Sequence, residues 1–288
     1  MKNNIQQMFK GLGVALITPF KADGQIDFSS LTALVNRVVE EGVDYLLALG
    51  TTSEYPTLSP AEKDDVLACI LEANAHRLPV MVGLGGPNTQ FMIRKLEHLA
   101  PFEVDAILTV TPYYNKPSQA GLVAHYKAFT SATDKPVFLY NVPGRTSCNL
   151  EVATTLQIAA ECPNVVGIKE ASGYMKQILQ LICKRPDNFL VISGDDLLTL
   201  PLMAAGADGL ISVMANAYPG KVARMVHHIM DQQLVPLTID CFKEGSPAGV
   251  KAIMAAQHVV ENTLRLPLVP VSEKLQKEIE QLVASSVL

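Results

Sequence analysis

Lys169 is the residue whose position most suggests chemistry. It directly follows the apolar run Val165–Ile168, so its amine is expected where a buried strand ends in a pocket. Removal from water disfavours the ammonium form and lowers the pKa of a lysine, as a Schiff-base nucleophile requires at neutral pH. The alternative is a stem that passes apolar neighbours while the ammonium pairs with Glu170 or Asp195, and position alone slightly favours this alternative.

Hydroxyl and guanidinium groups follow other apolar runs of the same kind. Tyr140 has the donor and acceptor capacity of a proton shuttle, although a tyrosine there could equally cap the core. Thr51 and Thr52 follow a glycine in a tight turn that could hold a small carboxylate, but turns more often satisfy their own backbone. Arg145 lies in a rigid turn that could aim its guanidinium at a carboxylate, whereas loop arginines are normally solvated.

The remaining polar residues near these runs suggest less. Tyr113 and Tyr114 are ambiguous between packing and function, and Asp195 and Asp196 are expected to be N-caps of the next helix. The six histidines mostly fall in helical segments and none lies in this group, which disfavours a metal-dependent aldolase. The residues therefore indicate lysine-centred carbonyl chemistry with no metal and no cofactor.

These candidates lie at the ends of short apolar runs that alternate with helical patterns. Eight runs have the nearly continuous apolar character of parallel strands buried on both faces: Val14–Ile17, Tyr45–Leu49, Val80–Gly83, Ala106–Val110, Val137–Tyr140, Val165–Ile168, Leu190–Ile192 and Leu210–Val213. This α/β pattern predicts a (β/α)8 TIM barrel, in which catalytic residues lie at the carboxyl ends of the strands. A dinucleotide-binding fold would need a glycine fingerprint after the first strand, and the sequence there is Thr18-Pro19-Phe20.

The alternation stops near the C-terminus. Three helical patterns follow, the middle one capped by Ser246-Pro247 and the last beginning near Ser272. We therefore expect a catalytic barrel over residues 1–231 and a helical appendage over residues 232–288.

Composition excludes several other classes of protein. The chain has 288 residues, 49% of them hydrophobic, and a net charge of −5. This mild acidity, without basic blocks, argues against nucleic acid, and no apolar run approaches a membrane span. The N-terminus lacks the pattern of a targeting peptide, and the five scattered cysteines suggest free thiols, so we expect a cytoplasmic protein.

Five segments, taken together, resemble the signature of the dihydrodipicolinate synthase family in order and spacing. They are Gly50-Thr51-Thr52-x-Glu54, Thr111-Pro112-Tyr113-Tyr114-Asn115, Tyr140-Asn141-Val142-Pro143-Gly144-Arg145-Thr146-Ser147, Ile168-Lys169-Glu170-Ala171 and Ser193-Gly194-Asp195-Asp196. The resemblance covers essentially the whole chain, including Leu264-Arg265-Leu266-Pro267.

The resemblance implies a pyruvate-dependent class I aldolase mechanism. Lys169 would attack the ketone of pyruvate, Tyr140 would be the general acid/base, and Thr51 with Tyr114 would complete a proton relay. The enamine would then attack L-aspartate 4-semialdehyde, giving 4-hydroxy-tetrahydrodipicolinate in lysine biosynthesis. The resemblance also implies a homotetramer of two tight dimers, with Tyr114 entering the site from a neighbouring subunit and Tyr113 packing there.

It further implies how the substrates are held. Thr51 and Thr52 would bind the pyruvate carboxylate, and the main chain around Ile211 would lie against the Schiff base. Related enzymes such as N-acetylneuraminate lyase and 2-keto-3-deoxygluconate aldolase share the lysine and tyrosine and are the first alternative. Arg145 favours the synthase, because the Gly-Arg-Thr turn is associated with binding the semialdehyde carboxylate.

The sequence departs from the family pattern at two places. Ser53 replaces a usual glycine and adds a Cβ where the loop is expected to need positive φ. Around the lysine-feedback site this chain carries Tyr55, Pro56, Pro60, Lys63, Pro87 and Phe91, which predicts weak or absent inhibition by lysine. A hypothesis of another class is a non-catalytic barrel that binds a small keto acid, since a fold alone does not fix a function.

Overall fold

The computed structural model describes residues 2–227 and 234–285. Within these residues, eight parallel strands follow one another around a closed barrel in chain order, which confirms the predicted fold. The strands are β1 (Gly11–Ala15), β2 (Tyr45–Ala48), β3 (Val80–Leu84), β4 (Ala106–Val110), β5 (Val137–Asn141), β6 (Val165–Glu170), β7 (Leu190–Ser193) and β8 (Gly209–Ser212).

The helices alternate with the strands up to the C-terminal region. They are α1 (Lys2–Met8), α2 (Phe28–Glu40), α3 (Pro60–Asn74), α4 (Thr89–Leu99), α5 (Gln119–Thr130), α6 (Pro143–Thr146), α7 (Val152–Glu161), α8 (Met175–Lys184), α9 (Thr199–Ala204), α10 (Pro219–His227), α11 (Leu234–Lys243), α12 (Ala248–Ala256) and α13 (Glu273–Ser285). Short 3-10 turns are η1 (Thr51–Ser53), η2 (Tyr55–Thr57) and η3 (Met214–Asn216).

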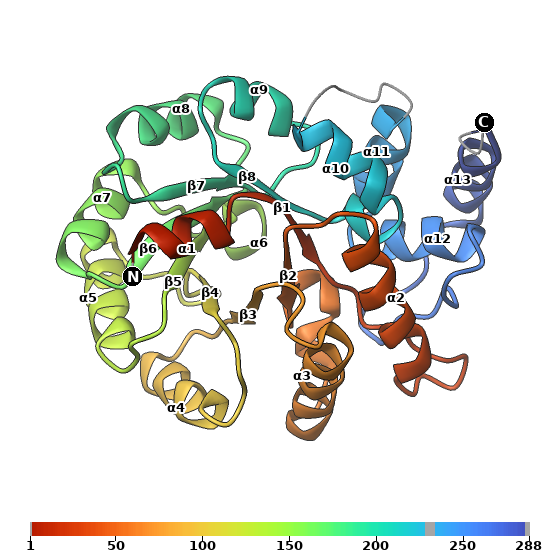
Figure 1. The fold of residues 1–288 in the computed structure, drawn as a ribbon, viewed down its shortest axis with the longest axis horizontal. Helices are drawn as coiled ribbons and strands as arrows, with labels where there is room; N and C mark the ends of the chain where they lie inside the picture. Colours follow the sequence, from red (N-terminus) through yellow and green to blue (C-terminus); the bar gives the residue numbers. More distant parts are fainter. Residues whose placement is uncertain (1, 228–233, 286–288) are drawn as a thin grey trace. The chain divides into compact units, whose positions relative to one another are not determined.

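The chain forms two compact units. The first comprises residues 1–11 and 79–211, and it holds β3 to β7 with α4, α5, α7, α8 and α9 outside them (Figure 1). Neighbouring strands in this unit pair in register, Ile107 with Val137 and Gly167 with Leu190. Phe9, which is fully buried, packs edge-on against Phe138 with ring centroids 5.4 Å apart, and so anchors the N-terminal segment on this core.

The second unit comprises residues 12–78 and 212–288. Its helix α3 begins with a complete capping box, in which the Ser59 hydroxyl accepts from Glu62 N and the Glu62 carboxylate accepts from Ser59 N. Asn216 joins segments far apart in the chain, because its amide accepts from Ile17 N at 3.1 Å and donates to Ala15 O at 2.8 Å. The end of β1 is therefore tied to η3.

Several boundaries differ from those expected from the sequence. The first strand begins at Gly11 rather than Val14, because glycines interrupt the apolar run there without interrupting the strand. The N-cap of α12 is Pro247 and makes no side-chain cap bond, so capping of this helix by Ser246-Pro247 was wrong. Ser272 does cap the last helix, since its hydroxyl accepts from Leu275 N at 3.3 Å.

The three predicted C-terminal helices are present as α11, α12 and α13. The expected boundary between residues 231 and 232 lies outside the described residues and stays a prediction. No helix in the described ranges is long and apolar enough to cross a membrane.

Candidate active site

Lys169 and Tyr140 lie side by side on neighbouring strands. They are register partners of β6 and β5, so their side chains leave the same face of the sheet. The Lys169 Nζ lies 4.6 Å from the centre of the Tyr140 ring. Lys169 is only 5% exposed and Tyr140 8%. The structure thus holds an amine and a phenol together in a place that is largely shielded from water.

Lys169 is the fifth residue of β6, where the sequence suggested a position just after the strand. Its neighbour Glu170 points to the opposite face, as successive strand residues must. The Glu170 carboxylate accepts from Asn141 Nδ2 at 3.2 Å and from Ser172 N at 2.9 Å. Burial raises the pKa of Glu170, while hydrogen bonds from Ser172 and Asn141 oppose that shift.

The proposed pairing of the Lys169 ammonium with Glu170 or Asp195 is not what the structure shows. Glu170 is engaged as described, and Asp195 Oδ1 accepts from Leu197 N at 2.9 Å and from Leu198 N at 3.2 Å. Asp195 therefore closes a turn before α9 and is not its N-cap, which is Leu198. Among residues 2–227 and 234–285, the structure records no ion pair for Lys169.

Gly194 is a contributor that sequence reasoning missed. A Cβ on this residue would lie 2.8 Å from Lys169 Cε and 2.8 Å from Ala171 Cβ. Any side chain here would have to push the lysine stem aside, so the glycine leaves the space that the stem of Lys169 occupies. Its place in the Ser193-Gly194-Asp195 segment could have marked it as part of the site. Only the structure explains why the residue is a glycine.

Arg145 lies in α6, a single helical turn that replaces the simple turn expected there. Its backbone N–H donates to Val142 O at 2.9 Å. Thr146 stabilises the turn, since its hydroxyl donates to Cys148 O at 3.0 Å and accepts from the Thr111 hydroxyl at 3.3 Å. The Arg145 side chain is exposed to solvent, so the turn presents it at the surface of the first unit.

Tyr113 and Tyr114 differ sharply in exposure from Tyr140. Tyr114 is 93% exposed and has a φ of 69°, and Tyr113 is 38% exposed. A positive φ is uncommon for a residue with a bulky side chain. The backbone is held in this form in part by a bond from Asn115 N to Tyr113 O at 2.9 Å. The loop thus projects an aromatic hydroxyl away from its own unit.

Thr51 and Thr52 lie in the second unit, in η1, which follows β2 after Leu49 and Gly50. Thr51 is exposed, whereas Thr52 is 5% exposed. The turn is closed by bonds from Ser53 N to Gly50 O and from Glu54 N to Thr51 O, each 3.2 Å long. A compact turn near the carboxyl end of a strand therefore holds one exposed and one buried threonine.

The expectation that Ser53 occupies a position needing positive φ was wrong. Positive φ falls on Leu49 and Glu54 instead, at 53° and 58°. Ser53 adds to the turn, because its hydroxyl donates to Gly50 O at 2.7 Å and its carbonyl accepts from Thr18 at 2.8 Å. The added Cβ therefore does not strain this loop.

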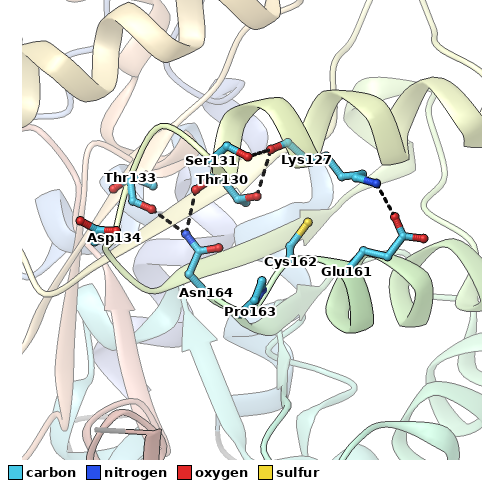
Figure 2. A pocket seen from close by; sticks show the side chains of 9 residues that line it. All are labelled: Lys127, Thr130, Ser131, Thr133, Asp134, Glu161, Cys162, Pro163 and Asn164. Carbon is cyan, nitrogen blue, oxygen red and sulfur yellow. Dashed lines mark hydrogen bonds and ion pairs between the residues drawn. The ribbon is translucent and has the colours of Figure 1, made fainter.

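A cavity of about 340 Å³ lies elsewhere in the first unit, near the ends of α5 and α7 (Figure 2). Its lining includes Asn164, which directly precedes β6, so it lies at the opposite end of that strand from Lys169. Its polar groups bind one another: Lys127 pairs with Glu161 at 2.8 Å, and the Asn164 amide donates to Thr133 O at 2.8 Å. This end of a barrel strand usually serves stability, so this cavity is a weaker candidate for the site than the surroundings of Lys169.

Ile211 is fully buried in β8. In the described residues, no three His, Cys, Asp or Glu side chains gather as a metal-binding group. What the first unit offers is an amine beside a phenol, and what the second offers is a hydroxyl-bearing turn. Such groups suit imine formation with a keto acid, and the absence of a cofactor stays a prediction.

The chain matches known proteins over nearly its full length. Residues 8–286 match the model of the dihydrodipicolinate synthetase family. A 4-hydroxy-tetrahydrodipicolinate synthase of Porphyromonas gingivalis is 42% identical, over 94% of this chain and 98% of that protein. One of Parabacteroides distasonis is 45% identical, over 95% of this chain and 97% of that protein.

Solved structures give the same result. A monomeric dihydrodipicolinate synthase variant superposes with a TM-score of 0.94 at 38% identity, covering 98% of each chain. The dihydrodipicolinate synthase of Thermotoga maritima has a TM-score of 0.93 at 38% identity, covering 97% of this chain and 99% of that one.

Proposed function

The chain belongs to the dihydrodipicolinate synthetase family, and we propose that it condenses pyruvate with L-aspartate 4-semialdehyde through a Schiff base on Lys169. The observation that carries this assignment is the buried Lys169 amine 4.6 Å from the Tyr140 ring, on neighbouring strands. The product is 4-hydroxy-tetrahydrodipicolinate, an intermediate of lysine and diaminopimelate biosynthesis.

The chemistry begins with the uncharged amine. Lys169 adds to the ketone carbon of pyruvate, and Tyr140 transfers the protons that convert the carbinolamine into an imine with loss of water. Loss of a methyl proton gives the enamine, whose carbon attacks the aldehyde of the semialdehyde. The amino group of the second substrate then displaces Lys169 from the imine carbon, which closes the ring and frees the enzyme.

Other residues hold the two substrates in this proposal. Thr51 and Thr52 bind the pyruvate carboxylate, and the main chain at Ile211 lies along the Schiff base. Arg145 binds the carboxylate of the semialdehyde, a role that its exposed position on α6 supports. Thr51 and Tyr114 complete the proton relay with Tyr140.

The alternatives raised by the sequence are less well supported. N-acetylneuraminate lyase and 2-keto-3-deoxygluconate aldolase would share the lysine and tyrosine, but the full-length relatives at 42–45% identity carry the synthase name. The same relatives argue against a non-catalytic keto-acid-binding barrel. Comparing aspartate semialdehyde with sialic acid and keto-deoxy sugar acids as substrates checks this preference directly.

Borohydride trapping tests the central step. The protein is incubated with pyruvate, reduced with sodium borohydride and mapped by peptide mass spectrometry. We expect a reduced pyruvate adduct on the peptide that holds Lys169 and none on the peptide that holds Lys251, which is also a buried lysine. A protein that turns over without any Lys169 adduct would contradict the Schiff-base mechanism.

We also propose a homotetramer built as a dimer of dimers, in which Tyr114 acts in the site of a neighbouring subunit. The 93% exposure of Tyr114 supports this, because a relay residue must be covered to work in a shielded site. One solved relative is a monomeric variant, so the assembly has to be measured. Sedimentation velocity gives the subunit number.

Co-expression of two inactive variants then tests the subunit origin of Tyr114. One chain carries Lys169→Ala and the other Tyr114→Phe. If Tyr114 acts across an interface, a mixed dimer contains one site with both residues intact and regains activity. If it acts within its own chain, every site lacks one of the two and the mixture stays as inactive as its parents.

We further propose that the enzyme works in the cytoplasm. All five cysteines are free thiols in the structure, as is usual in a reducing compartment.

A further inference from the structure

Glu54 ends the turn that presents Thr51 and Thr52, and it does so in a conformation that needs support. Its φ of 58° and ψ of 32° are left-handed, which costs free energy for any residue other than glycine. Its carbonyl accepts from Thr57 N at 2.8 Å and from the Thr57 hydroxyl at 2.9 Å. The backbone on both sides of the turn therefore depends on where Glu54 is held.

The Glu54 carboxylate is fully buried and is bound from the C-terminal region of the chain. Lys251 Nζ, on α12, lies 2.5 Å from Oε1, and the backbone N–H of Arg265 donates to Oε2 at 3.1 Å. Lys251 is also fully buried. Its Nζ also donates to Thr263 O at 2.9 Å and lies 4.2 Å from the centre of the Phe20 ring.

Arg265 fixes the same segment a second time. Its guanidinium donates to Thr57 O at 3.2 Å and to both oxygens of Glu62, at 2.9 and 2.6 Å. It also donates twice to Gly24 O, at 3.0 and 2.9 Å. Because Glu62 belongs to the capping box of α3, the arginine joins the end of the turn to the start of the next helix.

We propose that Lys251, together with Glu54 and Arg265, forms a positioning set that holds the Thr51–Thr52 turn in the geometry that binds the pyruvate carboxylate. None of the three needs to touch substrate. The inference rests on the proposed role of Thr51 and Thr52, and it adds the residues that place their hydroxyl and N–H groups.

A purely stabilising role would not require charges. A buried ion pair is usually no more stable than apolar side chains of the same volume, because both ions lose their hydration. The desolvation is visible here, since burial lowers the pKa of Lys251 to about 8 while Glu54 opposes the shift. Hydrogen bonds to a charged group fix the orientation of its side chain. Glu54 accepts such bonds at both carboxylate oxygens.

Two variants and a control separate positioning from stability. Lys251→Met removes one charge, and the double variant Glu54→Gln with Lys251→Met removes both and leaves no buried ion unpaired. Lys243→Met, on α11, breaks the exposed pair with Glu278 at 2.7 Å and is the matched control. For each protein we measure kcat, the KM of each substrate, the unfolding midpoint and borohydride trapping with pyruvate.

We expect Lys251→Met to raise the pyruvate KM by about tenfold to 100-fold, as a displaced binding group does. The KM for the semialdehyde should stay within about twofold, because that substrate is held elsewhere. The double variant should recover the unfolding midpoint but keep a raised pyruvate KM. The control should match the wild type in every measurement.

The proposal is overturned if a folded Lys251→Met protein keeps the wild-type pyruvate KM. It is also overturned if the double variant recovers stability and pyruvate KM together, since that would make the ion pair purely structural. If Lys251→Met does not fold, the double variant decides. A wild-type protein that traps no pyruvate on Lys169 would instead contradict the proposed function, so the two failures are distinguishable.

Discussion

Two buried lysines in this chain have opposite surroundings. Lys169 on β6 lies beside the Tyr140 ring and has no recorded ion pair in the described residues. Lys251 on α12 is held by the Glu54 carboxylate and by Thr263 O. An amine fixed in an ion pair cannot easily attack a ketone, whereas one beside a phenol can give up and regain a proton. The partner, rather than burial, therefore distinguishes the proposed nucleophile from the lysine that is held in an ion pair.

The same substitution at both lysines tests this comparison most strongly. Lys169→Met should lower turnover by more than about 10⁴-fold, because it removes the atom that bonds to pyruvate. Its free energy of unfolding should be unchanged or higher, since active-site groups are commonly kept at a cost in stability. Lys251→Met should lose about 3–5 kcal/mol of stability, because Glu54 is left as a buried unpaired charge.

Chemical denaturation and steady-state rates of the two variants are the required measurements. The comparison fails if Lys169→Met retains a rate near that of the wild type, or if Lys251→Met is as stable as the parent protein.

The next largest effect is expected at Tyr140. Lys169 lies beside this phenol, whereas the aromatic ring beside Lys251 is that of Phe20. Tyr140→Phe keeps the ring against the amine but removes the hydroxyl. We expect kcat to fall by about 10²–10⁴-fold, the usual contribution of a general acid/base. Trapping with pyruvate should become slower without disappearing. An unchanged rate of imine formation in rapid-mixing experiments would show that protons reach Lys169 by another route.

His125 shows what burial does to a titratable group for which the described part of the chain provides no ion-pair partner. Burial lowers its pKa to about 4 from 6.5, and its Nδ1 lies 2.9 Å from the Thr89 hydroxyl. Between pH 6.5 and 4, His125 binds a proton in the unfolded chain but stays neutral in the folded chain. The free energy of unfolding should therefore fall as pH drops from 6.5 to 4, by up to about 3 kcal/mol.

Denaturation curves of the wild type and of His125→Phe across that range measure this contribution. The variant should lose the part of the slope due to His125, whatever its absolute stability. Parallel slopes for the two proteins would mean that the histidine is not buried as a neutral group.

The strands and the two central residues of the candidate site could be predicted because each is encoded locally. Apolar runs of strand length marked all eight strands, and Lys169 and Tyr140 were found as polar residues at their ends. Single boundaries were less accurate, as at Gly11, because hydrogen bonding to a neighbouring strand extends a strand beyond its apolar run. Local patterns therefore predicted the order of elements better than their ends.

The Lys251–Glu54 pair could not be predicted in the same way. The two residues are 197 positions apart, and neither spacing nor periodicity relates them. One signal was present: Lys251 is the only charged residue in the otherwise apolar helix Ala248–Ala256, which implies a buried partner. Which carboxylate that is depends on the packing of the chain, as does the left-handed φ that falls on Glu54 rather than on Ser53.

Inhibition by L-lysine is the smallest expected effect. It concerns two other lysines, Lys63 and Lys95, each of which has its ammonium group against an aromatic ring. Lys63 Nζ lies 4.1 Å from the centre of the Tyr55 ring, and Lys95 Nζ lies 4.6 Å from that of Phe91. Free lysine brings two further ammonium groups, and each of these side chains would repel an ammonium group bound beside its own ring. We therefore expect no inhibition at sub-millimolar lysine in a steady-state assay, and a sub-millimolar inhibition constant would contradict this. If repulsion is the reason, Lys63→Ala or Lys95→Ala, each made alone, should make the enzyme more sensitive to lysine, whereas insensitivity of both variants would assign the effect to the shape of the site.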